Sequence, residues 1–319
     1  IMSDNPETRI DATVIICTYN RAASLKQTLA CLSRQDVPDS VSWEVIVVDN
    51  NSSDDTRRVT EEAASLFAET PLLYEFERAQ GLSHARNYGL GKATGGILLF
   101  TDDDVCPEPD WLSTTLDSMR QHQCDACGGY IAPTWEAEPP AWLTERFYGF
   151  LAVRTDETGP KKILSADDAP YGANMAFRRS AFDQVGLFDT TRGRTGNTLA
   201  SGEDGEMFAR ILSAGMQVMY FPGSRVRHRV EAFRVRRAYF RRWRFQNSRN
   251  LAQSRGVPGT RRLMGIPLYL FPQLLRAVFR AAVARITQPA DEAFHREIIV
   301  WHFLGLIVGL HDIYSGEKT

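Results

Sequence analysis

Four short apolar runs, separated by turns and helical patterns, constrain the fold of this chain more than any other feature. The runs span residues 12–17, 44–48, 72–76 and 97–101. Helical faces lie between them, marked by Leu25, Leu29 and Leu32, by Val59, Ala63 and Leu66, and by the stretch 83–92. Because alternating strands and helices build a parallel sheet with right-handed crossovers, the sequence predicts an α/β fold.

Polar residues follow three of these runs, at the point where each predicted strand ends. They are Thr18–Arg21, Asp49 and Asp102–Asp104. Ligands of open α/β sheets bind at the carboxyl ends of the strands. We therefore expect these three groups to converge on one binding crevice.

Charge divides the chain into two parts. Residues 1–230 carry 22 basic against 33 acidic side chains, a net charge of −11, whereas residues 231–319 carry 15 against 6, a net charge of +9. Such a split indicates two parts with different partners. We expect a main domain over 1–230 and a basic, helical C-terminal region over 231–319.

The cysteines are odd in number and scattered along the chain, at Cys17, Cys31, Cys106, Cys124 and Cys127. This usage argues against a disulfide scaffold and for a reducing compartment. Cys124 and Cys127 lack a second Cys or His pair at zinc spacing, so we expect two buried thiols there. The polar start of the chain does not read as a secretory leader. Together these features predict a cytoplasmic protein.

Several stretches of the sequence, taken in order, resemble the family 2 glycosyltransferases. They are VIICTYNRAASLKQTL, EVIVVDNNSSDDT, GLSHARNYGLGKATGGILLFTDDDVCPEPDWL, YGANMAFRRSAFDQVGLFD, GEDGEMFARIL and the histidine of VRHRV. The resemblance covers roughly residues 10–230. It implies the GT-A fold, with a Rossmann-like nucleotide-binding half and a mixed central sheet. It also implies a nucleotide-sugar donor and transfer that inverts the anomeric centre.

The aspartate triplet is the expected metal site. A diphosphate leaving group departs with negative charge, and Mg²⁺ or Mn²⁺ bound by carboxylates can bridge its oxygens. The resemblance implies that Asp104 coordinates this metal, and that Asp102 contacts the ribose or the metal. Asp103 is counted with the nucleotide-binding residues. His228 is expected at the metal or the diphosphate. The alternatives are a solvated acidic turn and a structural histidine.

The nucleotide is expected to lie at the first two strand ends. The resemblance implies that Asp49 accepts a hydrogen bond from uracil, which points to a UDP-sugar; the alternative is an aspartate that caps the following turn. Arg86 is expected to reach the base or the diphosphate, with a surface ion pair as its alternative. Thr18, Tyr19 and Arg21 form the loop over the nucleotide, where Tyr19 can pack on the base.

The chemistry of inverting transfer needs a carboxylate that removes the proton of the acceptor hydroxyl. By resemblance, the motif from Gly202 supplies it: Asp204 is the expected general base, and Glu203 orients the acceptor or the loop. The alternative is that these acids only favour the helix macrodipole. Gly172 and Asn174 resemble the glycine loop that lets the backbone approach the donor sugar.

The basic C-terminal region predicts contact with a membrane. Six arginines interleave with five aromatic residues between positions 233 and 245, which suits anionic headgroups or a phosphate-bearing acceptor; the alternative is a solvated helix. Apolar residues between Leu274 and Ile286 share one side of a helical wheel, as in interfacial helices. The apolar run 298–310 has 13 residues, fewer than the about 20 that span a bilayer. We expect a monotopic protein on the inner face of the cell membrane. The alternative is a helical pair that forms a homodimer.

Taken together, the resemblance implies a hexosyl- or N-acetylhexosaminyltransferase that uses Mn²⁺ or Mg²⁺. Its expected acceptor is a saccharide or a lipid-linked glycan in cell-surface polysaccharide synthesis. A nucleotidyltransferase is the first alternative, but it needs a glycine-rich loop after the first strand, which CTYNRAAS lacks. A nucleic-acid-binding protein is disfavoured by the acidic main domain. A non-catalytic scaffold is disfavoured by the intact acidic motifs.

Overall fold

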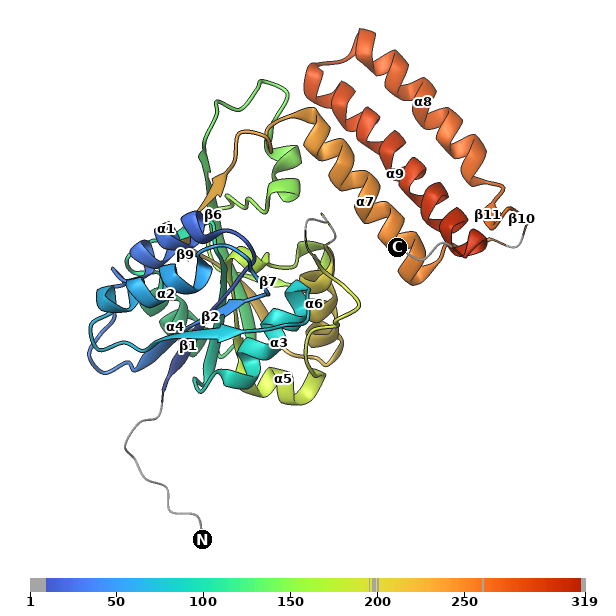
Figure 1. Cartoon of the computed structure of the whole chain (residues 1–319). Helices are drawn as coiled ribbons and strands as arrows, with labels where there is room; N and C mark the ends of the chain where they lie inside the picture. The colour runs from blue at the N-terminus through green and yellow to red at the C-terminus, as the bar shows by residue number, and fades with distance from the viewer. Residues whose placement is uncertain (1–9, 195, 197–198, 200, 260, 317–319) are drawn as a thin grey trace. The chain divides into compact units, whose positions relative to one another are not determined.

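The computed structural model describes residues 10–194, 196, 199, 201–259 and 261–316, which fall into two units (Figure 1). The sheet unit comprises 1–134, 152–196 and 202–229. The helical unit comprises 135–151, 197–201 and 230–319. The segment 135–151 therefore belongs with the C-terminal helices, although three further strands of the sheet follow it in the chain.

A mixed sheet forms the centre of the sheet unit. Among the described residues its strands are β1 (Ala12–Thr18), β2 (Trp43–Asp49), β3 (Leu72–Phe76), β4 (Ile97–Asp102), β5 (Val105–Pro107), β6 (Ala126–Trp135), β7 (Lys161–Ile163), β8 (Met175–Arg178) and β9 (Val218–Val230). The order is β3-β2-β1-β4-β8-β6-β9-β5, with β7 paired to β9. Strands β1 to β4 are parallel, and β8 runs antiparallel to β4. This is the predicted α/β architecture with the mixed sheet that the resemblance implied.

Helices cover both faces of this sheet. They are α1 (Ala22–Leu32), α2 (Thr56–Ala63), α3 (Leu82–Lys92), α4 (Trp111–His122), α5 (Arg179–Val185) and α6 (Glu203–Ser213). Successive strand residues point to opposite faces. Val14 and Ile16 accordingly pack with α1, α2 and α4, while Ile15 packs with α3, α5 and α6. Burial on both sides explains why the central strands are continuous apolar runs rather than alternating ones.

The predicted elements of the first hundred residues are confirmed, with one correction in α2. The helix ends at Ala63, and the turn Ala64–Leu66 is a 3-10 helix. This tighter turn changes the phase of the chain. As a result Leu66 is 52% exposed, and Phe67 is buried instead.

Three long helices run side by side in the helical unit, with α9 (Ala290–Ser315) between α7 (Arg237–Arg255) and α8 (Leu270–Thr287) (Figure 1). Two residue pairs, β10 (Arg262–Leu263) and β11 (Ile266–Pro267), form a small hairpin. Helices α7 and α9 approach closely at two glycines of α9. A Cβ on Gly305 would lie 2.4 Å from the carbonyl oxygen of Phe245, and one on Gly309 equally close to that of Arg249.

Helix α8 exposes most of its large apolar residues. Its buried residues are Leu270, Ala277 and Ala284. Leu275 and Phe279 are each 70% exposed, and Ile286 is 88% exposed. The predicted amphipathic helix therefore exists, and the structure leaves much of its apolar face uncovered.

Helix α9 corrects the expectation drawn from the short apolar run 298–310. The helix has 26 residues and, within the described part of the chain, it alone is long and apolar enough to cross a membrane. One third of its most apolar window is buried inside the structure. Length and composition therefore no longer separate a helix that spans a bilayer from one that lies on it.

Candidate functional site

The ends of three parallel strands bring the predicted nucleotide residues together. In the sheet register Thr18 of β1 lies opposite Asp49 of β2, and Cys17 lies opposite Asp102 of β4. The loop after β1 is tied to the turn after β2, because the Asn20 backbone N–H donates to Ser52 Oγ at 2.9 Å. The predicted convergence of the three polar groups is confirmed.

Asp103 faces the interior of the sheet unit. Thr18 Oγ1 donates to Asp103 Oδ2 at 2.7 Å, and Arg21 Nε lies 3.1 Å from Asp103 Oδ1. Thr28 Oγ1 of α1 donates to the Asp103 carbonyl oxygen at 2.9 Å. Burial raises the pKa of Asp103 to about 7. These contacts make Asp103 an anchor of its loop, and its expected contact with the nucleotide stays a prediction.

Asp104 and His228 lie side by side because β5 pairs with β9, where Val105 is opposite His228. Asp104 Oδ1 is 3.3 Å from His228 Nε2, and Asp104 Oδ2 accepts a hydrogen bond from Arg21 Nη2 at 2.9 Å. Both Asp104 and His228 are buried. The sequence separates these two residues widely, and the pairing of β5 with β9 brings them together. Their expected contact with a metal or a diphosphate stays a prediction.

The residues around Asp104 fit a divalent cation in kind. Among the described residues, no three His, Cys, Asp or Glu side chains converge as a complete metal cage. Mg²⁺ and Mn²⁺ often take only one or two protein carboxylates and complete their shell with phosphates and water. Burial, and then the charge of Asp104, raises the pKa of Asp102. A cation between these two carboxylates would relieve that repulsion.

Asp49 makes the capping contact that was its alternative reading. The Ser52 backbone N–H donates to Asp49 Oδ1 at 2.8 Å, and the Tyr74 hydroxyl donates to Asp49 Oδ2 at 2.8 Å. A carboxylate oxygen accepts more than one hydrogen bond, so these contacts leave capacity for a base. The expected contact with uracil stays a prediction.

Arg86 forms ion pairs with the acidic motif at the start of α6. Its Nη1 lies 2.5 Å from Asp204 Oδ1 and 3.6 Å from Glu203 Oε1. The guanidinium is buried, 5.2 Å from the centre of the Phe188 ring and 5.9 Å from that of Phe100. Burial opposes its charge, but Asp204 and Glu203 outweigh burial and raise the pKa of Arg86. The ion pair that was the alternative for Arg86 is thus present, but it is buried and lies on the acidic motif. The expected contact of Arg86 with the base or the diphosphate stays a prediction.

Both oxygens of Asp204 have a donor. Arg86 holds Oδ1, and the Gly172 backbone N–H donates to Oδ2 at 2.9 Å. Glu203 lies deeper, and its Oε2 is buried without a hydrogen-bond partner among the described residues. Burial, and then the charge of Asp204, raises the pKa of Glu203 to about 7. The two acids therefore differ. Asp204 accepts hydrogen bonds from two donors, whereas the pKa of Glu203 lies at about 7.

The Arg86 side chain can occupy its observed position only because residue 172 is a glycine. A Cβ at Gly172 would lie 2.1 Å from Arg86 Nη2 and 3.1 Å from Asp204 Oδ2. The missing side chain thus makes room for the ion pair. Asn174 has a structural task as well, since its Nδ2 donates to the carbonyl oxygens of Tyr130 and Ser224 and its Oδ1 accepts from Trp111 Nε1. Contact of either residue with a donor sugar stays a prediction.

The loop Arg192–Arg194, which lies outside the motifs quoted above, also reaches the site. The Ser83 hydroxyl donates to the Arg192 carbonyl oxygen at 3.0 Å, and the Leu82 N–H donates to that of Arg194 at 2.8 Å. The charge of Arg194 lowers the pKa values of Asp102 and Glu203, although burial is the larger influence on both. Arg194 therefore lies near both acidic groups. The signal was an arginine between glycines shortly before the acidic motif.

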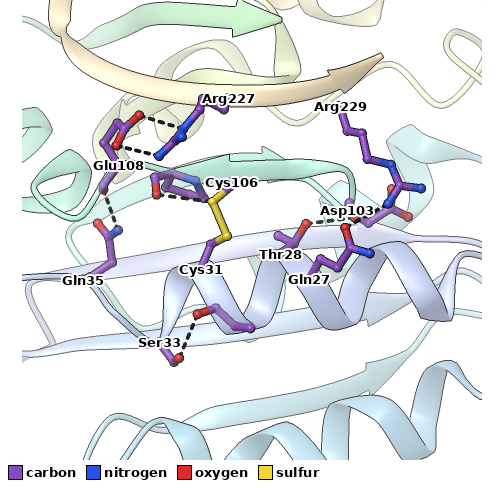
Figure 2. Close-up of a disulfide and its surroundings, with 12 residues drawn as sticks. Gln27, Thr28, Cys31, Ser33, Gln35, Asp103, Cys106, Glu108, Arg227 and Arg229 are labelled. Atoms are coloured by element: carbon purple, nitrogen blue, oxygen red, sulfur yellow. Dashed lines mark hydrogen bonds and ion pairs between the residues drawn. A yellow bond between two sulfur atoms is a disulfide. The ribbon is translucent and has the colours of Figure 1, made fainter. Parts of the chain in front are cut away.

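A disulfide joins Cys31 of α1 to Cys106 of β5, directly after the aspartate loop (Figure 2). The expectation that the cysteines are thiols of a reducing compartment is wrong for this pair. Its cause is tertiary: β5 lies beside α1, where Thr28 holds the backbone of Asp103. Cys17, Cys124 and Cys127 are free, and the last two are buried as predicted.

Comparisons with known proteins agree with this geometry. The model of the family described as "Glycosyl transferase family 2" matches residues 13–186. The glucosyl-dolichyl phosphate glucuronosyltransferase of Haloferax volcanii is 28% identical over 226 residues, 70% of each chain. The succinoglycan biosynthesis protein ExoM of Rhizobium meliloti is 28% identical over 245 residues, 76% of this chain and 74% of that protein.

Solved structures show the same fold. The mannosyltransferase PcManGT of Pyrobaculum calidifontis, in complex with GDP-Man and Mn²⁺, matches with a TM-score of 0.55 at 21% identity, over 99% of this chain and 79% of that one. TarS of S. aureus, in complex with UDP, matches with a TM-score of 0.53 at 16% identity, over 96% and 92%. At these identities the likeness concerns the fold alone.

Proposed function

The chain belongs to glycosyl transferase family 2 and has the GT-A fold, and from that premise we propose that it is an inverting, metal-dependent enzyme that uses a UDP-sugar. Its acceptor is a saccharide or a lipid-linked glycan. The names of the relatives from Haloferax volcanii and Rhizobium meliloti support such acceptors. One observation carries the proposal: the buried Arg86 guanidinium lies 2.5 Å from Asp204 and 3.6 Å from Glu203, and the charge of Asp102 acts on the same guanidinium. A donor-side acid and an acceptor-side acid therefore share one site.

On the donor side, Asp104, Asp102 and His228 would hold Mn²⁺ or Mg²⁺. When bound, the ion supplies positive charge for the departing diphosphate. The solved structures with Mn²⁺ support a divalent ion. Arg21 keeps Asp104 oriented through its 2.9 Å hydrogen bond. Asp49 is proposed to accept from the base, beside Thr18 and Tyr19.

On the acceptor side, Asp204 is the proposed general base. It takes the proton of the acceptor hydroxyl while that oxygen attacks the anomeric carbon and the bond to the diphosphate breaks. Gly172 and Arg86 hold both of its oxygens and so fix its direction. Arg86 is therefore proposed as the residue that positions the base, in addition to the nucleotide contact implied by resemblance. Glu203 orients the acceptor or the loop.

A donor screen tests the function. The enzyme is incubated with a panel of UDP- and GDP-sugars and Mn²⁺, and released nucleotide is measured with and without acceptor glycans. We expect turnover with UDP-sugars that rises with acceptor and disappears in Asp204→Asn. Absence of turnover with every donor would overturn the proposal, and turnover with GDP-sugars alone would replace the assigned base.

The helical unit is proposed to hold the enzyme on the inner face of the cell membrane. Its exposed apolar residues on α8 and its arginines on α7 support this placement. The Cys31–Cys106 disulfide points the other way, because disulfides are rare in reducing compartments outside hyperthermophiles. Alkylation of free thiols in intact cells tests on which side of the membrane the enzyme lies. If Cys31 and Cys106 resist alkylation because they are disulfide-bonded, as the cysteines of a periplasmic or external marker protein do, the inner-face placement is contradicted.

A further inference from the structure

Two arginines of α7 rest on aromatic rings. Arg237 lies 5.4 Å from the centre of the Trp142 ring and 5.0 Å from that of Phe294. Arg244 lies 5.1 Å from the centre of the Phe150 ring. The two arginines are seven residues apart, about 10 Å along the helix, and so share one face. Stacking fixes the plane of each guanidinium.

Three other arginines of the helical unit are different, because each is paired with a carboxylate. Arg241 lies 2.5 Å from Glu297, Arg249 lies 2.6 Å from Asp312, and Arg296 lies 2.8 Å from Glu292.

Arg237 and Arg244 have no such partner in the part of the chain that the structure describes, and the Nε of each is buried without an acceptor. Burial lowers the pKa of Arg244, and no carboxylate opposes this shift. Among the described residues, no carboxylate therefore pairs with either of these two half-buried cations.

The surroundings of Arg244 add polar nitrogen atoms. Burial is the largest influence lowering the pKa values of His295 and His302; for His295 the charge of Arg146 comes next, and the charge of Arg244 contributes to both shifts. Nδ1 of His302 is hydrogen-bonded to Ser248 Oγ at 2.8 Å. Nδ1 of His295 is buried without a partner among the described residues. The two imidazoles add hydrogen-bonding nitrogen atoms, and the carboxylate whose charge acts on His295 is Glu292, which is itself paired with Arg146 and Arg296.

We propose that Arg237 and Arg244 form a binding site for the phosphate or diphosphate ester of a lipid. The planar guanidinium presents paired N–H donors that match phosphate oxygens. Because the aromatic rings already restrain each arginine side chain, binding of an anion costs less side-chain conformational entropy. An anion there compensates charge that no described carboxylate neutralises. The headgroup of an anionic bilayer and that of a lipid-linked acceptor share this chemistry. The second source rests on the proposed function, whereas binding itself does not.

Farnesyl diphosphate, a short-chain lipid diphosphate, is the probe. Its affinity for the full-length protein is measured by calorimetry and by tryptophan fluorescence in EDTA, which removes metal-dependent binding of diphosphate. We expect R237Q/R244Q to weaken binding roughly tenfold or more, since charge-assisted hydrogen bonds are lost. R276Q/R280Q is the matched control: it removes the same charge from exposed positions of α8 and should change affinity less than about twofold. Thermal melting verifies that each variant is folded.

R237K/R244K separates a shaped site from diffuse attraction. Lysine keeps the charge but loses the fork, so we expect most of the affinity to be lost. Wild-type affinity in the lysine variant, equal losses in the two glutamine variants, or no binding by the wild type would each overturn the proposal.

Two further comparisons identify the kind of molecule that supplies the bound phosphate. Tighter binding of farnesyl diphosphate than of inorganic pyrophosphate assigns the site to a lipid, and equal binding contradicts that part. Vesicles of phosphatidylcholine with phosphatidic acid are then compared with vesicles carrying a polyprenyl phosphate. The donor screen tests the function separately. If the protein has no transferase activity but binds farnesyl diphosphate, the proposed function fails and the binding site stands. If it has transferase activity but does not bind farnesyl diphosphate, the proposed function stands and the binding site is overturned.

Discussion

The two units of the molecule treat buried charge in opposite ways. In the sheet unit acids outnumber the cations beside them: Arg21 serves Asp103 and Asp104, and Arg86 serves Glu203 and Asp204. In the helical unit, Arg237 and Arg244 lie against aromatic rings, and no acid among the described residues is paired with them. A buried charge without compensation is costly. We therefore propose that a cation completes the acidic site of the sheet unit and that an anion completes the arginine pair of the helical unit.

Removal of the cation should have the largest effect. We expect EDTA to abolish sugar transfer and Mn²⁺ or Mg²⁺ to restore it, because a departing diphosphate needs positive charge beyond that of Arg21. Asp104→Ala should lose donor binding, measured by calorimetry, together with turnover. Full activity in excess EDTA would show that the acids of the sheet unit need no ion.

The general base comes next. Asp204→Asn should lower turnover by roughly 10²–10⁴-fold, the usual worth of acid–base catalysis, while donor affinity stays nearly unchanged. Steady-state kinetics and donor titration measure the two quantities. Glu203→Gln is the paired variant, and a larger loss there than in Asp204→Asn would move the base to Glu203.

Much of the donor side was predictable from sequence, because strand ends in a parallel sheet share one edge. Thr18, Asp49 and Asp102 follow directly from the period of the apolar runs. The pairing of Arg86 with Asp204, 118 positions apart, was beyond that reasoning. Local periodicity fixes an element, but the side chains that meet between distant elements depend on how those elements pack.

The same limit explains the other misses. Cys31 and Cys106 meet because β5 lies beside α1, which neither local pattern reveals. The wheel of α8 predicted an apolar stripe, but not that residues such as Phe279 would remain exposed. A pattern states which face is apolar, and only packing decides what covers it.

Gly172→Ala tests whether the acids and Arg86 form one assembly. A Cβ there would collide with Arg86 Nη2, which is buried and has little room to move. We expect a loss of turnover of roughly 10- to 100-fold from displacement of the base, together with weaker donor binding, because Arg86 is also the proposed nucleotide contact. Gly91→Ala is the control, since nothing lies within 4 Å of its added Cβ. Equal activity of the two variants would separate Arg86 from the chemistry.

Membrane binding probes the opposite unit and should change by a smaller factor. The intact protein is expected to pellet with anionic liposomes, and high salt should weaken this without eliminating it, because apolar burial remains. Phe279→Ser should reduce pelleting several-fold, whereas Leu66→Ser, an equally simple change on the sheet unit, should not. A protein that ignores liposomes but elutes as a dimer would favour the homodimer reading.

The smallest effect is a pH dependence of stability. Burial raises the pKa of Glu203 from 4.5 to about 7, so the folded protein retains a proton there that the unfolded chain releases. The free energy of unfolding should therefore fall as pH rises from about 4.5 to about 7. Glu203→Gln should flatten this slope in thermal melts recorded with EDTA. A slope unchanged in the variant would assign the titration to another group.

The disulfide between Cys31 and Cys106 closes a covalent ring within the sheet unit. It closes over a separation of 75 positions, and that span contains Asp49, Arg86 and Asp102. A single backbone cut anywhere within it leaves both fragments attached by the sulfur bridge. These three residues are thereby carried on a covalent ring, and after a cut the ring fragments stay joined only as long as the disulfide is oxidised.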